Sequence, residues 1–292
     1  MRLSRTARIL FWIAVVVIAV VTLFPFYWTL RTALTFPRGV FAHPTMFLPP
    51  EPTLGNFERV LGLVDAATSV SLGGSGQKIN FFIFLRNSIV VSTLITVGQT
   101  FFSAAAAYAF ARMRFPLRRQ IFGLYLSALM VPGIVLLIPN FILVKTLGWL
   151  DTYQGIAAPA FLMSPFAVFF LRQFFLGLSR ELEEAALVEG AGRVRIFFQI
   201  AIPLSATALA TLAVITFIYS WNDYLWPLLV GRGESVRMLT VAIGIFRQQG
   251  AQNIPDWAGL MAGTTLAILP TLVLFLALGK RVINSIGFTG FR

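Results

Sequence analysis

The hydrophobic pattern of the chain is dominated by six long stretches that contain no Asp, Glu, Lys or Arg. They cover residues 9–30, 87–111, 120–144, 152–171, 196–222 and 257–279. An α-helix needs about 20 predominantly apolar residues to cross the hydrocarbon core of a bilayer, where a central charge costs roughly 2.5–3.5 kcal/mol. The pattern therefore predicts six transmembrane helices, the fifth of which we place at about residues 204–226.

Composition agrees with this assignment and defines the class of protein. The chain has 292 residues, of which 58% are hydrophobic and only 12% are charged, and its mean hydropathy is +0.82. A soluble domain would carry about a quarter charged residues. We therefore predict an all-α polytopic membrane protein that forms a single transmembrane domain over residues 1–292. Residues 31–86 are predicted to form a long extracytoplasmic loop.

The basic residues are distributed unevenly among the connecting segments, and this distribution predicts the orientation. If both termini lie in the cytoplasm, fourteen of the 23 basic residues are inside. They are Arg2, Arg5, Arg8, Arg112, Arg114, Arg118, Arg119, Arg172, Arg180, Arg193, Arg195, Lys280, Arg281 and Arg292. Cytoplasmic loops carry an excess of Lys and Arg, so an N-in, C-in topology is predicted. We interpret the net charge of +12 as this topology signal and not as a nucleic-acid-binding surface.

Groups that could perform catalysis or couple transport to ions are missing from the charge-free stretches. The chain has no cysteine, and its one histidine, His43, lies in the predicted extracytoplasmic loop. Enzymes need a general base, a nucleophile or a metal, and ion-coupled transporters place ionisable residues near the membrane midplane. Here Asp223 stands at the outer edge of the fifth span. We expect neither a catalytic site nor a metal site, and an ion-coupled secondary transporter is kept as the alternative.

Neutral polar residues remain within the predicted spans, and they suit the passage of an uncharged polar solute. The candidate contacts for such a solute lie within the spans or at their mouths, and they are Asn87, Tyr108, Asn140, Asn222 and Asp223. The same amides and hydroxyls also serve, in many membrane proteins, to bond neighbouring helices. Both interpretations stay open for each of these residues.

One amphipathic segment near the middle of the chain breaks the apolar pattern. It reads EEAALVEGAGRVRIFFQIAIP and covers residues 183–203. A helix is predicted over about residues 180–198, because Ser179 is a favourable cap and the acidic residues of the first turn complement the helix dipole. Its apolar face is formed by Leu187, Ala191, Val194 and Phe198.

This predicted helix is too short and too charged to cross the membrane, so it should lie along the surface. Small residues let another protein approach its backbone, and they are Ala185, Ala186, Gly190 and Gly192. The alternative is an interfacial helix that binds only lipid headgroups. Four acidic against three basic residues in Arg180–Arg195 favour docking of a cytosolic partner, because anionic lipids prefer basic faces.

The segment EEAALVEGAGRVRIFFQIAIPLS resembles the cytoplasmic EAA loop of ATP-binding cassette importer permeases. Further segments are similar to the carbohydrate-uptake subfamily, in the maltose permease G-subunit group. They are TLGNF (53–57), LRNSIVVST (85–93), AAAYAFARMRFP (105–116), YSWNDYLWPLLV (219–230) and GFTG (287–290). The sequence departs from the pattern at Glu189, where the family has aspartate, and in its tail, which lacks the usual extension.

The resemblance implies a type I importer permease fold with a cytoplasmic coupling helix between helices 4 and 5. The residues implied to dock an ATPase subunit are Glu184, Ala185, Ala186, Glu189, Gly190, Ala191 and Arg193. We expect Phe197, Phe198 and Pro203 to tie this helix to the neighbouring spans, because slack between them would waste the motion of the ATPase.

The resemblance also implies the partners and the location of the chain. It implies a heterodimer with a second homologous permease, two copies of a cytosolic nucleotide-binding subunit, and an extracytoplasmic sugar-binding protein. The chain itself would bind no cofactor, since ATP and Mg are used by the partner subunits. A multi-pass protein of the bacterial or archaeal inner membrane is expected, whose solute is a sugar, a polyol or a glycerol-phosphate-type molecule.

Overall fold

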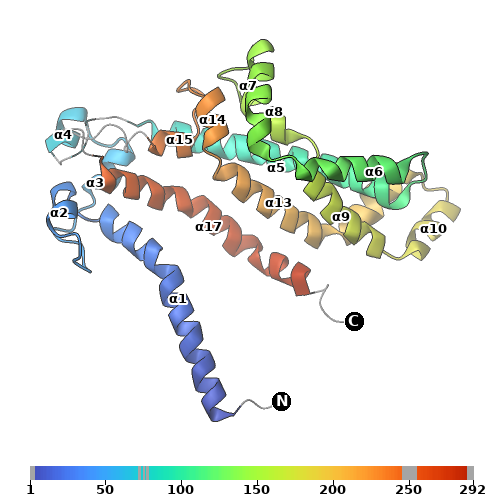
Figure 1. Ribbon diagram of the computed structural model, residues 1–292, viewed down its shortest axis with the longest axis horizontal. Helices are drawn as coiled ribbons and strands as arrows, with labels where there is room; N and C mark the ends of the chain where they lie inside the picture. Colours follow the sequence, from blue (N-terminus) through green and yellow to red (C-terminus); the bar gives the residue numbers. More distant parts are fainter. Residues whose placement is uncertain (1–3, 72–73, 75, 77–78, 245–254, 288–292) are drawn as a thin grey trace. The chain divides into compact units, whose positions relative to one another are not determined.

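The structure is a computed structural model that describes residues 4–71, 74, 76, 79–244 and 255–287. Over these residues it is helical, with one isolated bridge between Thr35 and Pro52 and no strand, which confirms the predicted all-α class (Figure 1). The predicted GFTG ending and the tail beyond Gly287 lie outside the described residues. Two compact units are present, unit 1 (Met1–Phe82 and Ala242–Leu269) and unit 2 (Ile83–Val241 and Pro270–Arg292).

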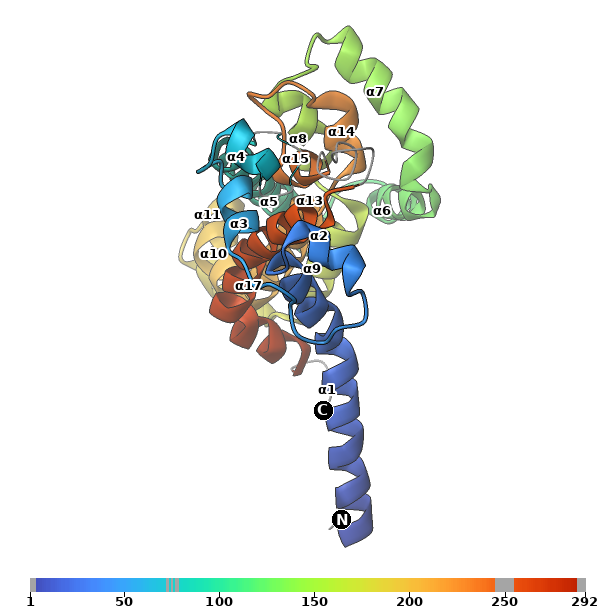
Figure 2. The same cartoon turned by 90° about the vertical axis from the view of Figure 1, so that its left-hand side faces the viewer.

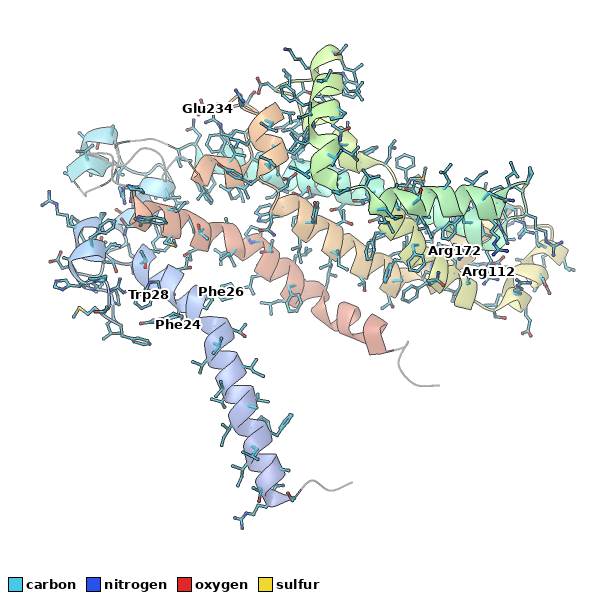
Figure 3. The ribbon with its side chains drawn as sticks, viewed as in Figure 1. Phe24, Phe26, Trp28, Arg112, Arg172 and Glu234 are labelled. Atoms are coloured by element: carbon cyan, nitrogen blue, oxygen red, sulfur yellow. The ribbon has the colours of Figure 1, made fainter. Side chains whose placement is uncertain are left out.

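Unit 1 begins with α1 (Arg5–Ala33), which contains the first predicted span. Ser4 caps this helix, because its hydroxyl accepts a hydrogen bond from the backbone N–H of Ala7 at 3.2 Å. Apolar side chains cover α1 and most of them are exposed; Figure 3 labels two of the exposed ones, Phe24 and Phe26. An apolar helix that buries little of its surface against its own chain is suited to lipid.

The predicted loop 31–86 contains three short helices of unit 1, namely α2 (Pro37–Ala42), α3 (Gly55–Val60) and α4 (Ala66–Ser71). A buried ion pair fixes α3, since Arg59 Nη1 lies 2.6 Å from Asp256 Oδ2 and both side chains are at most 2% exposed. Asn56 accepts a second bond from Arg59 and donates to the backbone oxygens of Ala33 and Thr35. The extracytoplasmic candidate segment is therefore folded around a polar core.

Unit 2 is built on α5 (Phe81–Arg112), which contains the second predicted span. The other long helices of the chain are α13 (Ala206–Trp221) in unit 2 and α17 (Trp257–Gly287), whose first residues belong to unit 1. The shorter helices α6 (Arg118–Ser127), η1 (Ala128–Met130), η2 (Gly133–Leu136), α7 (Leu137–Thr146), α8 (Tyr153–Phe161), α9 (Pro165–Gly177), α14 (Leu225–Val230) and α15 (Leu239–Ile243) complete the fold. The remaining elements, described below, are α10, α11, η3 and α12.

Three of the predicted spans are bent within their charge-free stretches. The bend is 92° between the α6 and α7 segments, 47° between α8 and α9, and 78° before α13. Figure 2 shows α7 leaving α6 at this sharp angle. The first bend falls at Val131 and Pro132, which have extended backbone, because a proline disfavours helical geometry in the residue before it. The second falls between Leu162 and Pro165, where Ser164 caps α9.

The described residues contain three helices long and apolar enough to cross a membrane, or up to six spans if each bent pair is one span. The three are α1, α5 and α17. The six-span count, the N-in, C-in orientation and the single domain remain predictions.

Two buried apolar clusters hold unit 2 together, and they lie toward opposite ends of α5. The α10-end core includes Ala104, Tyr108, Phe175, Ile196 and Leu212. The α14-end core includes Val91, Ile95, Ile156, Val230 and Met238. Figure 1 shows the helices α10 and α14, from which these names are taken, near the two ends of this unit. Each core positions a different set of the residues singled out from the sequence.

Candidate functional site

The predicted amphipathic helix is present but is shorter than predicted. It forms α10 (Arg180–Val188), capped by Ser179, whose hydroxyl accepts from the N–H of Glu181 at 3.2 Å. The chain then leaves the helix, and Gly190 has a φ of +83°. A left-handed residue ends a helix, and glycine adopts this conformation at little cost. The continuous helix predicted over 180–198 is therefore wrong, because the glycine that was interpreted as a docking residue also terminates the helix.

A second helical segment follows the turn and leads toward α13. It consists of α11 (Arg193–Ile196), a π-helix labelled η3 (Phe197–Ala201) and α12 (Ile202–Leu204). The backbone N–H of Ile202 bonds the carbonyl of Phe197, the i→i−5 pattern that defines a π-turn. The candidate docking segment is thus two short helices joined by a tight turn.

Most of the predicted docking residues lie on the surface of this segment. Glu184, Ala185, Glu189, Gly190 and Arg193 are exposed. Apolar side chains are exposed beside them, most strongly Val188 (89%), with Leu182 and Val194. The segment therefore presents a surface of mixed charged and apolar character, which is the usual character of a protein interface.

Two of the predicted docking residues also contact the rest of unit 2. Ala186 and Ala191 are partly buried against the α10-end core. Of the apolar face predicted with Ala191, the side chains of Leu187, Val194 and Phe198 are exposed. The segment contacts its own core through its alanines, because only short side chains let the turn approach that closely.

Glu183 attaches α10 to the rest of unit 2, and sequence reasoning missed it. Its carboxylate lies 3.2 Å from Arg112 Nε and 3.8 Å from Arg193 Nη1, and the side chains of Glu183 and Arg112 are only 8% and 5% exposed. Arg112 also donates to the backbone oxygen of Leu178. Figure 3 shows Arg112 at the end of unit 2 where α10 lies. No local pattern points to Glu183, because its partner Arg112 lies 71 residues earlier in the chain.

The three predicted anchor residues differ in how they are packed. Phe197 is buried, and its ring lies 5.3 Å from that of Tyr108. Phe198 is half exposed and stacks near Phe101, at 6.4 Å between ring centroids. Pro203 is exposed. The residues Ile196 and Ala201, which sequence reasoning did not select, are fully buried at the same place.

Tyr108 does not lie with the other polar candidates. It is buried in the α10-end core, where its ring contacts those of Phe175 and Phe197. Asn87 and Tyr108 belong to one helix, α5, and a rise of 1.5 Å per residue separates them by about 31 Å along its axis. The grouping of Tyr108 with the solute contacts is therefore wrong. A position within a predicted span identifies the helix, but it does not say how far along the helix axis the residue lies.

Asn87 is fully buried and its amide is committed to hydrogen bonds within the chain. The Nδ2 group donates to the backbone oxygens of Ser235 and Arg237, each at 3.0 Å. The Oδ1 atom accepts from the Tyr153 hydroxyl at 2.7 Å and from Arg86 at 3.3 Å. The structure favours the bonding alternative for this residue, since no donor or acceptor of its side chain is left for a solute.

Asn140 and Asp223 line a cavity of about 600 Å³ in unit 2, between α5, α7, α8, α13 and α14. Its other polar lining residues are Gln99, Thr216, Tyr219, Ser220 and Trp226. Asn222 does not line it; this side chain is exposed and donates to the carbonyl of Ile218 at 2.7 Å. The lining holds one carboxylate and no lysine or arginine among the described residues, so the cavity suits an uncharged polar solute.

Comparison with protein families places this geometry in a known context. The family described as "Binding-protein-dependent transport system inner membrane component" matches residues 99–286. The matched range begins within α5 and includes α10, the π-helix and the Asp223 cavity wall.

Individual relatives match over nearly the whole chain. A sn-glycerol-3-phosphate transport system permease protein UgpE from Yersinia pestis bv. Antiqua (strain Antiqua) is 36% identical over 259 residues, which are 88% of each chain. The protein of the same name from Salmonella choleraesuis (strain SC-B67) is 35% identical over 268 residues, 91% of each chain.

A solved structure shares the fold. A chain from the crystal structure of a bacterial ABC transporter involved in the import of the acidic polysaccharide alginate aligns with a TM-score of 0.79 and 23% identity. The alignment covers 96% of this chain and 99% of that chain. The helical arrangement is therefore that of an ABC importer permease.

Proposed function

The chain belongs to the family of binding-protein-dependent transport system inner membrane components, and on this premise we propose that α10 and its turn couple it to a cytosolic ATPase. It is the permease subunit of an ABC importer, and ATP hydrolysis takes place in a separate subunit. Ion-coupled secondary transport is not supported by this family assignment.

One observation supports the coupling proposal. The helix α10 combines an exposed face, here called its tip, with a buried attachment to the rest of unit 2. Glu184, Val188 and Glu189 are exposed, whereas Glu183 is held by Arg112 and Arg193. A motion imposed on the exposed tip is transmitted to α5 through the buried ion pair and to α13 through the helical segment that follows. Docking through Glu184, Ala185, Ala186, Glu189, Gly190, Ala191 and Arg193 is the role we assign to this surface.

The assembly we propose follows from the family. A second homologous permease completes the translocation path, two nucleotide-binding subunits use ATP and Mg, and an extracytoplasmic binding protein delivers the solute. Six spans in an N-in, C-in orientation put α10 in the cytosol, where an ATPase can reach it. Phe197, Phe198 and Pro203 act as the anchor of the segment, now with Ile196, Ala201 and Glu183 beside them.

For the solute we propose an uncharged polyhydroxylated molecule of the sugar class. The cavity beside Asn140 and Asp223 offers amides, hydroxyls and the indole of Trp226, which hydrogen-bond and cover a sugar ring. A phosphate or uronate would meet the carboxylate of Asp223 without a cation among the described lining residues. The solute that we propose therefore differs from the one in the relatives' names, which is sn-glycerol-3-phosphate. Among the candidates, Asn140 and Asp223 are the contacts, and Asn222 does not line the cavity.

The coupling proposal is tested in the assembled importer reconstituted in vesicles. Glu184→Arg with Val188→Asp reverses a charge and removes an apolar contact on the exposed tip without touching the Glu183 pair. We expect ATP-driven uptake to fall to background while the permease remains inserted. Lys145→Glu, an equally exposed charge reversal on α7, should leave uptake unchanged. Normal uptake and normal assembly of the tip variant would show that α10 is not the docking element.

A further inference from the structure

A second cavity of unit 2, of about 760 Å³, lies between the end of α5 and the docking segment. Five arginines line it, namely Arg112, Arg114, Arg118, Arg180 and Arg193. The remaining lining residues are Ala111, Met113, Leu176, Glu183, Glu184 and Leu187. The arginines come from α5, the turn after it, α6, α10 and α11, so separate elements bring them to one hollow.

The charges of this cavity are unbalanced. Arg112 and Arg193 share the carboxylate of Glu183. Among the residues that the structure describes, Arg114, Arg118 and Arg180 have no ion-pair partner. Glu184 is the only other acidic lining residue. Like charges gathered at one site repel one another, and a bound anion would relieve this repulsion.

The chemistry of the lining suits a phosphate group. The guanidinium is planar and donates pairs of parallel hydrogen bonds that match phosphate oxygens. In addition, α6 begins at the lining residue Arg118 and has no side-chain cap, so the partial positive charge of its first turn is available to an anion. The preceding Leu117 holds a left-handed backbone, with a φ of +59°, which turns the chain sharply into α6.

Topology alone does not explain this convergence. A basic residue at any exposed cytoplasmic position satisfies the positive-inside rule. Arg119 and Arg195 do so without lining the cavity. The five lining arginines are instead directed around a hollow beside exposed apolar residues, including Met113, Leu117 and Leu176. An apolar rim next to a cationic pocket matches a phospholipid, whose headgroup and acyl chains differ in the same way.

We propose that this cavity binds a phosphate group, which is presented either by an anionic phospholipid headgroup or by soluble phosphate. A phosphate held by Arg114 and Arg118 on one side and by Arg180 on the other would bridge the α5–α6 turn and the first residue of α10. The bound anion would then stiffen the base of the docking segment, in addition to the Glu183 ion pair. The site is defined by the cavity and does not depend on docking of an ATPase.

The test uses the assembled importer, stripped of lipid in detergent, and compares two double variants. Arg114→Gln with Arg180→Gln removes two lining cations that have no ion pair, and Arg119→Gln with Arg195→Gln removes two cations outside the cavity. Binding of short-chain phosphatidylglycerol and of phosphatidylcholine is measured by titration. We expect the first variant to weaken phosphatidylglycerol binding about tenfold or more, as for loss of bidentate phosphate contacts, and the second to weaken it less than about twofold.

A competition arm with inorganic phosphate distinguishes the two sources. Displacement of phosphatidylglycerol by millimolar phosphate assigns the site to soluble phosphate as well, whereas its failure assigns the site to the lipid. Equal losses in the two variants, or equal binding of the two lipids without any phosphate binding, would overturn the proposal.

A last arm tests whether an acidic segment of the ATPase occupies the cavity instead. The chain has no cysteine, so Arg114→Cys provides one reactive thiol. Crosslinking of this thiol to the ATPase subunit, together with insensitivity to added phosphatidylglycerol, would contradict an anion site. Protection of the thiol by phosphatidylglycerol and not by phosphatidylcholine is the expected result.

Discussion

The two ends of unit 2 use different interactions to hold their loops. At the α10 end, charged groups meet, and Glu183 is paired with Arg112 at 3.2 Å while both are nearly buried. At the α14 end, mostly neutral groups hold the chain, namely the amide of Asn87, the hydroxyl of Tyr153 and the hydroxyl of Ser88, which accepts from the N–H of Leu239 at 2.8 Å. The carboxylate of Asp151 also accepts there, from the N–H of Gly233 at 2.6 Å. Figure 3 shows Arg112 and Arg172 at the first end and Glu234 near the second.

This difference corresponds to what each end must do. A buried ion pair is costly to break, about 3–5 kcal/mol when one partner is removed, whereas a neutral hydrogen bond contributes about 1 kcal/mol. An element that receives force benefits from an attachment that does not yield. An element beside a solute cavity benefits from groups that bond in many directions.

The largest effect is expected from breaking the charged attachment. Glu183→Ala leaves Arg112 buried without its partner, and we expect a loss of about 3–5 kcal/mol in unfolding free energy, together with loss of uptake. Unfolding of the purified permease complex by denaturant measures the first quantity. Replacement of both residues, Arg112→Leu with Glu183→Leu, should restore much of the stability, so a double variant as unstable as Glu183→Ala would contradict the pairing.

A change in the neutral attachment should lower the stability by less. Asn87→Ala removes the bonds to Ser235, Arg237 and Tyr153 and leaves buried carbonyl groups unpaired, at a cost of about 1–3 kcal/mol. The matched control is Asn222→Ala, since this exposed amide bonds only within its own helix. If the two variants lose equal stability in the same denaturant assay, the Asn87 network does not hold the segment.

The turn after α10 provides a test at intermediate scale. Gly190 has a φ of +83° and Gly192 has −72°, and a Cβ at either would meet open space. Gly190→Ala should therefore cost about 1–2 kcal/mol from backbone strain alone, with reduced uptake per ATP hydrolysed, whereas Gly192→Ala should be silent. The ratio of uptake to ATP hydrolysis in vesicles is the measurement, and equal ratios would remove the role of the turn.

The smallest effect is expected at the solute cavity. Asp223→Ala removes one hydrogen-bond partner of the solute, a net contribution of about 1 kcal/mol, so the apparent affinity for a neutral sugar should fall by about fivefold. Uptake at varied solute concentration measures it, with Asn222→Ala as control. Asp223→Lys should create uptake of an anionic sugar if the carboxylate excludes such solutes, and its absence would argue against that selectivity.

The sequence predicted the apolar helices of unit 2 better than their course. Charge-free stretches identify where a chain can enter a bilayer, and the helical class follows because an isolated span must satisfy its own backbone. A hydropathy window averages over 20 residues or so and does not register a single backbone torsion. The bend at Pro132 and the π-turn at Phe197 were therefore not predicted, although Pro132 and Pro203 are present in the sequence.

At the candidate site, the sequence predicted the exposed residues of the docking segment but not the buried residues that attach it. Ser179 and Glu184 lie where local rules place a cap and an acidic surface, whereas Gly190 follows the end of a helix that we predicted to continue to residue 198. Arg112 and Glu183 are 71 residues apart in the printed sequence, and no local rule brings them together. The same limit applies to Tyr108. We grouped it with the solute contacts because it lies in a predicted span, but its position along α5 places it in the α10-end core.

The π-turn at Phe197–Ala201 has a consequence for which side of the segment meets the core. Ile196 and Ala201 are five residues apart and both are fully buried. On a regular α-helix, each residue advances by about 100°, so these two would point about 140° away from each other. The wider turn holds about one residue more and brings them to nearly the same azimuth. If the same residues wound as a regular α-helix, everything before them, α10 included, would be rotated out of phase with α13.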